Sequence, residues 1–354
     1  MTIPTQYYVD PGATVDTGSG TVGSPWGPRS AGSKPAVQHA LDTITRDATN
    51  GDQINVKSDQ AVGVTTTTDD TLAAALDFST YGASGFGNPL IIRGYTSAAN
   101  DGGIGGIDGA ATYGIQASSV GHHYVDMHLH NCGSAMVLTL GNYCVVLNCE
   151  LDNTSGGGID CSGAANYVIG CHLHDIGGIG IDGGSSAARI MRNYLKNGTK
   201  DFSSAIYVSS TMCVVTDNIV SVDGTSNGIN CASWGVLVQG NSILGGGSTG
   251  KGIIGPATGL SQFLNNLVEG FSGSGGVGIN LTAAGDVFVY GHNGTYNNAT
   301  EYSVTSDVHI DLGDNEELAA SPFAQSGADT FANRFVFFSP VDTDNVHGGA
   351  YVGS

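Results

Sequence analysis

Four ten-residue stretches decide the fold of this chain: HHYVDMHLHN (122–131), CVVLNCELDN (144–153), NYVIGCHLHD (166–175) and ARIMRNYLKN (188–197). Each carries a leucine at the same point, and successive leucines are 22 residues apart. A fixed period of this length indicates a solenoid, in which every repeat stacks on the one before it. The segments are short, rich in β-branched residues and bounded by Gly and Asn, which favours strands and argues against an α-solenoid.

Three apolar columns run through the repeat. The first comprises Leu129, Leu151, Leu173, Leu195, Val220, Ile243 and Val268. The second, five residues earlier in each coil, comprises Tyr124, Val146, Val168, Ile190, Val215, Val238 and Phe263. The third follows each Gly-rich loop and comprises Ile115, Val137, Ile159, Ile181, Ile206, Ile229, Ile253 and Ile279. Three inward positions per coil describe a three-sided tube, and an antiparallel barrel would not keep one register through so many coils.

A fourth file of residues precedes the first column by two positions. It comprises Met127, Cys149, Cys171, Asn193, Asn218, Asn241 and Asn266. Asparagines stacked at the strand spacing of about 4.8 Å can hydrogen-bond to one another along the axis. The last four members therefore predict an Asn ladder, with Cys and Met in its place in the earlier coils.

Both ends of such a tube expose unpaired strand edges and need caps. Residues 35–46 begin with Pro and carry apolar residues at helical spacing, which predicts a capping helix, and 51–57 and 89–95 read as strands. The fold predicted is an all-β, right-handed parallel β-helix solenoid with this N-terminal capping helix and an irregular C-terminal cap. Its parts are an N-terminal module at 1–60, the β-helix at 61–300 and a closing segment at 301–354, all one structural domain.

The composition limits the partners. The formal net charge is −20 and only 12% of residues are charged, so the surface repels nucleic acid and anionic membranes. Eleven Lys and Arg are too few to meet acidic polysaccharides unless a cation bridges the two, so neutral glycans are the easier partners. The seven cysteines show no metal-ligand pairing and are expected to be buried and reduced. Residues 1–20 show no secretory signal, and no apolar run is long enough to span a membrane.

Two polar files flank the leucine column on the outer face of the same strands. One is His128, Glu150, His172 and Tyr194; the other is His130, Asp152, His174 and Lys196. Imidazole and carboxylate about 5 Å apart suit a divalent metal or acid–base chemistry. The metal ligands predicted are His128, Glu150, His172, His130 and Asp152, with Ca²⁺ or another divalent cation as the candidate and no cofactor required. The simpler interpretation is a solvated strand face with favourable charge alternation.

The chain resembles the pectate-lyase-like superfamily of right-handed β-helix proteins, and within it uncharacterised viral and phage proteins. The resemblance rests on the Asn ladder, on Tyr7-Tyr8-Val9-Asp10-Pro11, on 36–56 with its Gly51-Asp52 step, and on 90–95. The superfamily includes polysaccharide lyases, glycosidases, epimerases and phage tail spikes, so the resemblance implies the fold more than an activity.

In enzymes of that superfamily the third strand and the loop before it form the substrate groove. The outward file on this strand includes Asp160, Asp182, Tyr207, Asn230, Ile254 and Asn280. Asp160 and Asp182, one coil apart, would suit a retaining glycosidase. The catalytic candidates are Asp160, Asp182, His174 and Lys196, and the glycan-binding candidates are Tyr194, Tyr207 and Asn230. The signatures of polygalacturonase-like hydrolases and alginate epimerases are missing.

Two hypotheses follow. The favoured one is a non-catalytic virion surface protein, a capsid decoration or short spike, that contacts other virion proteins or cell-surface polysaccharide and forms a homotrimer. It would be located on the virion or released outside the cell without a secretory signal. The alternative is a polysaccharide lyase or glycoside hydrolase that acts in the groove along the third strand.

Overall fold

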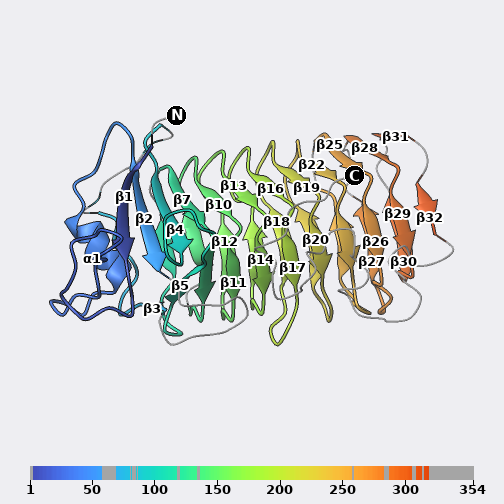
Figure 1. Ribbon diagram of the computed structural model, residues 1–354. Helices are drawn as coiled ribbons and strands as arrows, with labels where there is room; N and C mark the ends of the chain where they lie inside the picture. Colours follow the sequence, from blue (N-terminus) through green and yellow to red (C-terminus); the bar gives the residue numbers. More distant parts are fainter. Residues whose placement is uncertain are drawn as a thin grey trace. The chain divides into compact units, whose positions relative to one another are not determined.

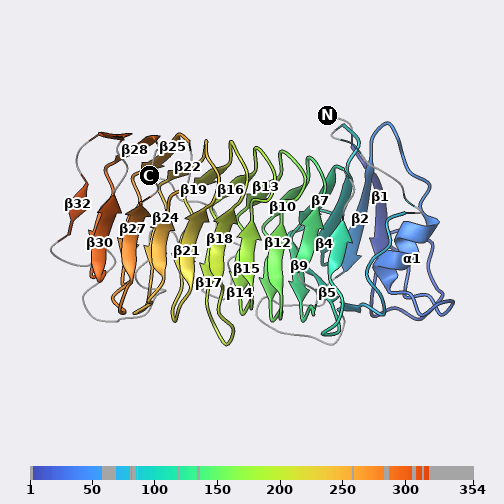
Figure 2. The same cartoon turned by 180° about the vertical axis from the view of Figure 1, so that it is seen from behind.

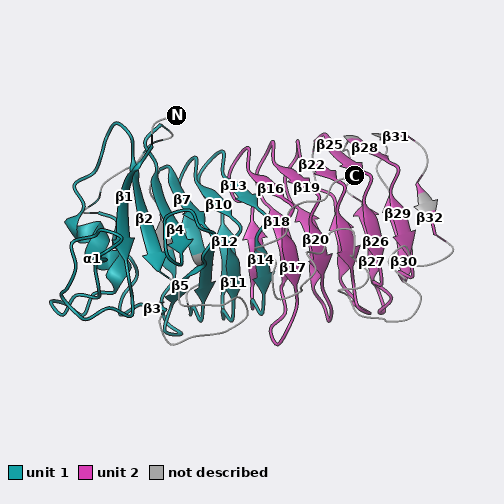
Figure 3. Ribbon diagram, in the orientation of Figure 1, with its two compact units in different colours: residues 1–176 teal, residues 177–354 magenta. Residues whose placement is uncertain are grey.

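The computed structural model describes residues 3–57, 69–79, 81, 85, 87–117, 120–133, 136–256, 259–282, 287–304, 308–312 and 315–318. The chain forms two compact units, Met1–Ile176 and Gly177–Ser354 (Figure 3). Each unit consists of short parallel strands in three sheets, which confirms the right-handed parallel β-helix (Figures 1 and 2). No helix among the described residues is long and apolar enough to cross a membrane.

The first unit holds one helix and fourteen strands of the three sheets. Its first sheet is β1 (Thr5–Val9), β2 (Asp52–Lys57), β4 (Leu90–Tyr95), β7 (His122–Val125), β10 (Val145–Leu147) and β13 (Tyr167–Ile169). Its second sheet is β3 (Asp70–Thr71), β5 (Gly105–Asp108), β8 (Met127–His130), β11 (Glu150–Asp152) and β14 (His172–His174). Its third sheet is β6 (Ile115–Ala117), β9 (Met136–Leu140) and β12 (Gly157–Asp160).

The second unit repeats the pattern. Its first sheet is β16 (Arg189–Met191), β19 (Val214–Thr216), β22 (Leu237–Gln239), β25 (Ser261–Leu264), β28 (Val287–Gly291) and β31 (Val308–Asp311). Its second sheet is β17 (Tyr194–Lys196), β20 (Ile219–Ser221), β23 (Ser242–Leu244), β26 (Leu267–Glu269), β29 (Gly294–Tyr296) and β32 (Glu316–Glu317). Its third sheet is β15 (Ile179–Asp182), β18 (Ser204–Val208), β21 (Asn227–Cys231), β24 (Lys251–Ile254), β27 (Val277–Leu281) and β30 (Thr300–Val304).

The inward columns of the first two sheets agree with the prediction. Leu151 pairs in register with Leu129 on one side and Leu173 on the other, and all three side chains are fully buried. Burial of a leucine side chain contributes about 1.5–3 kcal/mol, so every coil adds a similar increment to the core. The same strands therefore turn the residues on either side of each leucine outward.

The third column contains one error. Leu138, and not Val137, pairs with Ile115 and Ile159, and the Leu138 side chain is fully buried. The steps on either side of Leu138 are 23 and 21 residues, so a strict step of 22 selects the wrong neighbour. A shift of one residue exchanges the two faces of a strand.

Single residues in the left-handed conformation make the corners of each coil. Between the first and second sheets of the first unit these are Asp126, Asn148 and Gly170, with φ of 53°, 53° and 65°. After the second sheet, Asn131, Asn153 and Asp175 have φ between 48° and 53°. Asn, Asp and Gly tolerate this conformation at lower cost than other residues. The corners thus explain the regular spacing of these residues on both sides of the leucine column.

The Asn ladder lies in the second unit and is longer than predicted. Its members are Asn193, Asn218, Asn241, Asn266, Asn293 and Asn315. Each Nδ2 donates to the Oδ1 of the next asparagine at 2.9–3.0 Å. In the first unit, Cys149 and Cys171 instead direct their thiols at two backbone carbonyl oxygens each, at 3.4–3.6 Å. All seven cysteines are buried and free, as predicted.

The N-terminal helix α1 spans Ala36–Thr43, shorter than the predicted 35–46. It ends early because Ile44 has an extended conformation, with ψ of 129°. The buried Asp70 carboxylate accepts hydrogen bonds from the backbone N–H groups of Ala36 and Val37, at 2.7 and 2.8 Å, and so satisfies two free donors of the first turn. Beyond residue 300 the described strands β31 and β32 still pair with β28 and β29. Most of the predicted closing segment, residues 319–354, lies outside the described residues.

Candidate functional site

The candidate site is a cluster of four histidines and two carboxylates on the second sheet of the first unit, here named the His/carboxylate patch. Its members are His128, His130, Glu150, Asp152, His172 and His174. They come from three adjacent strands, β8, β11 and β14, which pair in parallel. On each strand the two polar residues flank the buried leucine, so both point away from the core.

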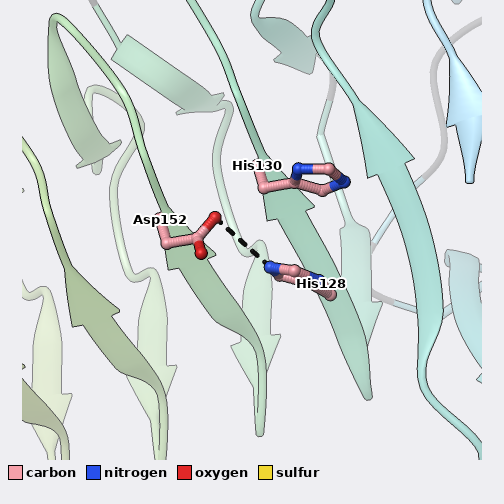
Figure 4. Close-up of side chains that lie close together, drawn as sticks. All are labelled: His128, His130 and Asp152. Atoms are coloured by element: carbon pink, nitrogen blue, oxygen red, sulfur yellow. Dashed lines mark hydrogen bonds and ion pairs between the residues drawn. The ribbon is translucent and has the colours of Figure 1, made fainter. Parts of the chain in front are cut away.

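Register alone does not decide which side chains meet. Glu150 is the register partner of both His128 and His172, and Asp152 is the partner of His130. The closest ring contact of Asp152 is nevertheless diagonal, since its Oδ1 lies 3.3 Å from Nε2 of His128 (Figure 4). The rings of His128 and His130 stack with centroids 4.5 Å apart. Together these three side chains form the first triad of the patch, with one potential ligand atom each within 4.8 Å of the others.

Glu150, His172 and His174 form the second triad, which meets the same 4.8 Å limit. Glu150 Oε1 lies 3.6 Å from Nδ1 of His172 and 3.1 Å from Nε2 of His174. A single carboxylate oxygen thus faces two imidazole nitrogens. His174 Nε2 is also 3.8 Å from Asp152 Oδ2, which brings the two triads into contact.

The electrostatics of the patch favour charged histidines. Burial lowers the pKa of His174, but hydrogen bonds with Glu150 and Asp175 outweigh it and raise that pKa to about 9. Burial likewise lowers the pKa of His130, and the hydrogen bond and charge of Asp69 reverse the effect, so that its pKa is raised. At neutral pH the His174 imidazolium is therefore paired with carboxylates. The patch can act as an ion-pair network or bind a divalent cation through nitrogen and oxygen ligands.

Two carboxylates that support the patch were missed by the sequence reasoning. Asp175 Oδ2 lies 2.8 Å from Nδ1 of His174, and Asp69 Oδ2 lies 2.7 Å from Nε2 of His130. Asp175 directly follows His174 and could have been found. Asp69 stands outside the repeat, and it reaches the patch because Gly106, the register partner of His128, has no side chain: a Cβ there would overlap the Asp69 carboxylate.

The candidate catalytic residues do not gather in one place. In the first unit, Asp160 lies on β12 of the third sheet, whereas His174 lies on β14 of the second sheet. In the second unit, Asp182 lies on β15 of the third sheet and Lys196 on β17 of the second sheet. Burial raises the pKa of the Asp160 carboxyl, although Ser162 opposes this by hydrogen bonding.

The glycan-binding candidates divide in the same way. Tyr194 lies half-buried on β17 of the second sheet, and its burial raises the pKa of its hydroxyl. Tyr207 lies on β18 in register with Asp182 on one side and Asn230 on the other. All three residues of this file are neither fully buried nor fully exposed. The outer face of the third sheet therefore carries a carboxylate, a phenol ring and an amide on successive coils.

No family model and no curated protein matches this chain. Among solved structures, it is similar to the PL6 family alginate lyase AlyGC, with a TM-score of 0.49, 13% identity, and coverage of 74% of this chain and 37% of that one. It is also similar to the tailspike protein of E. coli bacteriophage HK620 in complex with a pentasaccharide, with a TM-score of 0.49, 14% identity, and coverage of 79% and 63%. A mannuronic acid specific polysaccharide family 6 lyase from human gut microbiota gives 0.42 and 11%, over 80% and 77%. The chain spans less than two thirds of the length of the first two structures.

Proposed function

We propose that this chain is a surface β-helix protein that binds carbohydrate without cleaving it. The observation that carries the proposal is the file of Asp182, Tyr207 and Asn230, which register places on successive strands of one outer face. Neighbouring strands are about 4.8 Å apart, so the three side chains form a continuous polar strip with an aromatic ring at its centre.

The chemistry of the strip suits a neutral glycan. A tyrosine offers a flat apolar face together with a hydroxyl, and it loses little conformational entropy when it is immobilised. The Asp182 carboxylate accepts hydrogen bonds from sugar hydroxyls, while the Asn230 amide both donates and accepts them. A strip fixed on strands is also rigid before binding, which reduces the entropic cost of association.

The test is a glycan array followed by calorimetry on the strongest ligand. We expect Tyr207→Ala to weaken binding at least about tenfold, which corresponds to about 1.4 kcal/mol. Tyr296→Ala is the matched control, because Tyr296 is a half-buried tyrosine on β29 of the second sheet in the same unit. Equal affinity of the Tyr207→Ala variant and the parent chain would refute this site.

We also propose that the protein resides on a virion, as a capsid decoration or short spike. The support is indirect: a repeat-built β-helix and an acidic surface poor in charge, with a formal net charge of −20. In this role its partners are other virion proteins or cell-surface polysaccharide, and it assembles as a homotrimer. Mass spectrometry of purified particles should detect the chain, and light scattering should give the trimer mass; absence from particles would exclude the role.

A second candidate function is polysaccharide cleavage, which one observation favours. The raised pKa of Asp160 is the property that a general acid requires near neutral pH. An assay for new reducing ends and unsaturated products on neutral and acidic glycans distinguishes the two functions. Activity lost in Asp160→Asn, or in Asp182→Asn, would replace the binding role by catalysis, whereas no product from any glycan would exclude the enzyme.

A further inference from the structure

We propose that the His/carboxylate patch contains two adjacent binding sites for a transition-metal dication such as Zn²⁺, one in each triad. The first site comprises His128, His130 and Asp152, and the second comprises Glu150, His172 and His174. Each offers two imidazoles and one carboxylate. The inference is independent of carbohydrate binding, since the patch lies on the second sheet of the first unit.

The ligand types select the metal. Imidazole nitrogen suits Zn²⁺, Cu²⁺, Ni²⁺ and Fe²⁺, whereas Ca²⁺ and Mg²⁺ take oxygen ligands almost exclusively. Two imidazoles in each triad therefore argue against Ca²⁺. Three protein ligands leave one position of a tetrahedral ion for water.

The distances fit the same ions. Ligand atoms bound to Zn²⁺ at about 2.0–2.2 Å and at the tetrahedral angle lie about 3.4 Å from one another. In the first triad, His128 Nε2 and Asp152 Oδ1 are 3.3 Å apart. In the second, Glu150 Oε1 is 3.1 Å from His174 Nε2 and 3.6 Å from His172 Nδ1.

Outer carboxylates hold two of the rings as metal-binding proteins do. A histidine that binds a metal through one nitrogen usually donates the other N–H to a carboxylate, which fixes the ring orientation. Asp175 accepts from Nδ1 of His174 and leaves Nε2 directed at Glu150. Asp69 occupies Nε2 of His130 and leaves the other ring nitrogen of His130 as the ligand.

Burial and charge add to this arrangement. The histidine side chains of the patch are 7–22% exposed and the carboxylates 21–27%, so ligands are shielded while an ion can still enter. Strand β11 supplies one carboxylate to each site, on either side of the buried Leu151. Asp69, Asp108 and Asp175 bring further negative charge to the edge of the patch, which favours a dication over the empty sites.

The experiment measures Zn²⁺ binding to the full chain after removal of metals with a chelator. We expect two ions per chain in the parent, and one in each of His130→Gln and His172→Gln. His123→Gln is the control and should still bind two ions, because His123 lies on β7 of the first sheet. A parent chain that binds no Zn²⁺, or two variants that both keep two ions, would overturn the proposal.

Two further measurements keep the test decisive if a variant fails to fold. Asp175→Asn, which keeps the shape of the side chain, should weaken the second site about 10–100-fold. The parent loaded with Co²⁺ should show the intense visible absorption of four-coordinate cobalt, and a large excess of Ca²⁺ should not abolish it. Loss of the signal to Ca²⁺, or a weak six-coordinate spectrum, would contradict sites built from imidazole.

Discussion

At the scale of single residues, His122 is the clearest source of pH dependence. Its side chain is 1% exposed and packs against the Phe78 ring, and neither ring nitrogen has a hydrogen-bond partner within the described part of the chain. Burial, helped by the neighbouring His123, lowers the pKa of His122 to about 4 from 6.5. The folded chain therefore keeps this ring neutral where an unfolded chain would protonate it.

The sign of the effect follows directly. Between pH 6.5 and 4 the unfolded state binds the proton and the folded state does not, so stability falls as the pH is lowered through this window. We expect His122→Phe to reduce that loss by about 3 kcal/mol, measured as the difference in free energy of unfolding between pH 7 and pH 4. The exposed His292→Phe is the control. An unchanged pH dependence in His122→Phe would contradict the assignment.

Tyr124 gives a second prediction at this scale. Its side chain is fully buried, and its hydroxyl has no hydrogen-bond partner among the described atoms. Removing an unsatisfied buried hydroxyl takes away a desolvation cost, so Tyr124→Phe should leave stability equal or raise it by about 1 kcal/mol. Tyr81→Phe should instead cost about 1.5–3 kcal/mol, because the Tyr81 hydroxyl donates to the Asp52 carboxylate at 2.7 Å. Denaturant unfolding of both variants tests the contrast, which fails if they lose equal stability.

At the scale of the elements, the Asn ladder joins the coils of the second unit. Asn241 donates to Asn266 and accepts from both the backbone N–H and the side-chain amide of Asn218. Asn241→Ala leaves several buried groups without partners and should cost at least about 2 kcal/mol. We expect Asn241→Cys to cost less, because Cys149 and Cys171 show that a thiol reaches the backbone carbonyls at this position. Urea unfolding compares the two, and equal losses would argue against thiol substitution.

The elements also show how far the sequence leads. The leucine column and the outward files could be predicted because the step of 22 residues is regular there and side chains alternate along a strand. Val137 was the wrong choice over Leu138 because loop lengths vary while the strands stay aligned. Asn293 and Asn315 were missed because the repeat was followed only to about residue 290.

The site illustrates the same limit. Register predicted that the six residues of the His/carboxylate patch share one face, but not the diagonal contact of His128 with Asp152. Nor could the sequence locate Asp69, whose approach depends on the missing side chain of Gly106. Contacts set by rotamers and by segments outside a repeat are decided by packing, and periodicity carries no information about them.

At the scale of the whole molecule, both units are built from one coil in which parallel strands keep register. Every cluster described on the surface depends on this alignment, because residues about two dozen apart become neighbours only if the coils do not slip. A slip of one residue would turn the His/carboxylate patch towards the core and the leucines towards water. Stability and site therefore rest on the same alignment.

Paired cysteines in the coils that carry the patch measure this alignment most directly. Leu147 on β10 and Ile169 on β13 are half-buried register partners. Leu147→Cys with Ile169→Cys should therefore form a disulfide under mild oxidation, since in-register residues are about 4.8 Å apart. Leu147→Cys with Tyr167→Cys is the control, because that diagonal of about 7–8 Å is too long. Mass spectrometry should find the cross-link in the first pair and not in the second, and preferential linkage of the second pair would contradict the account.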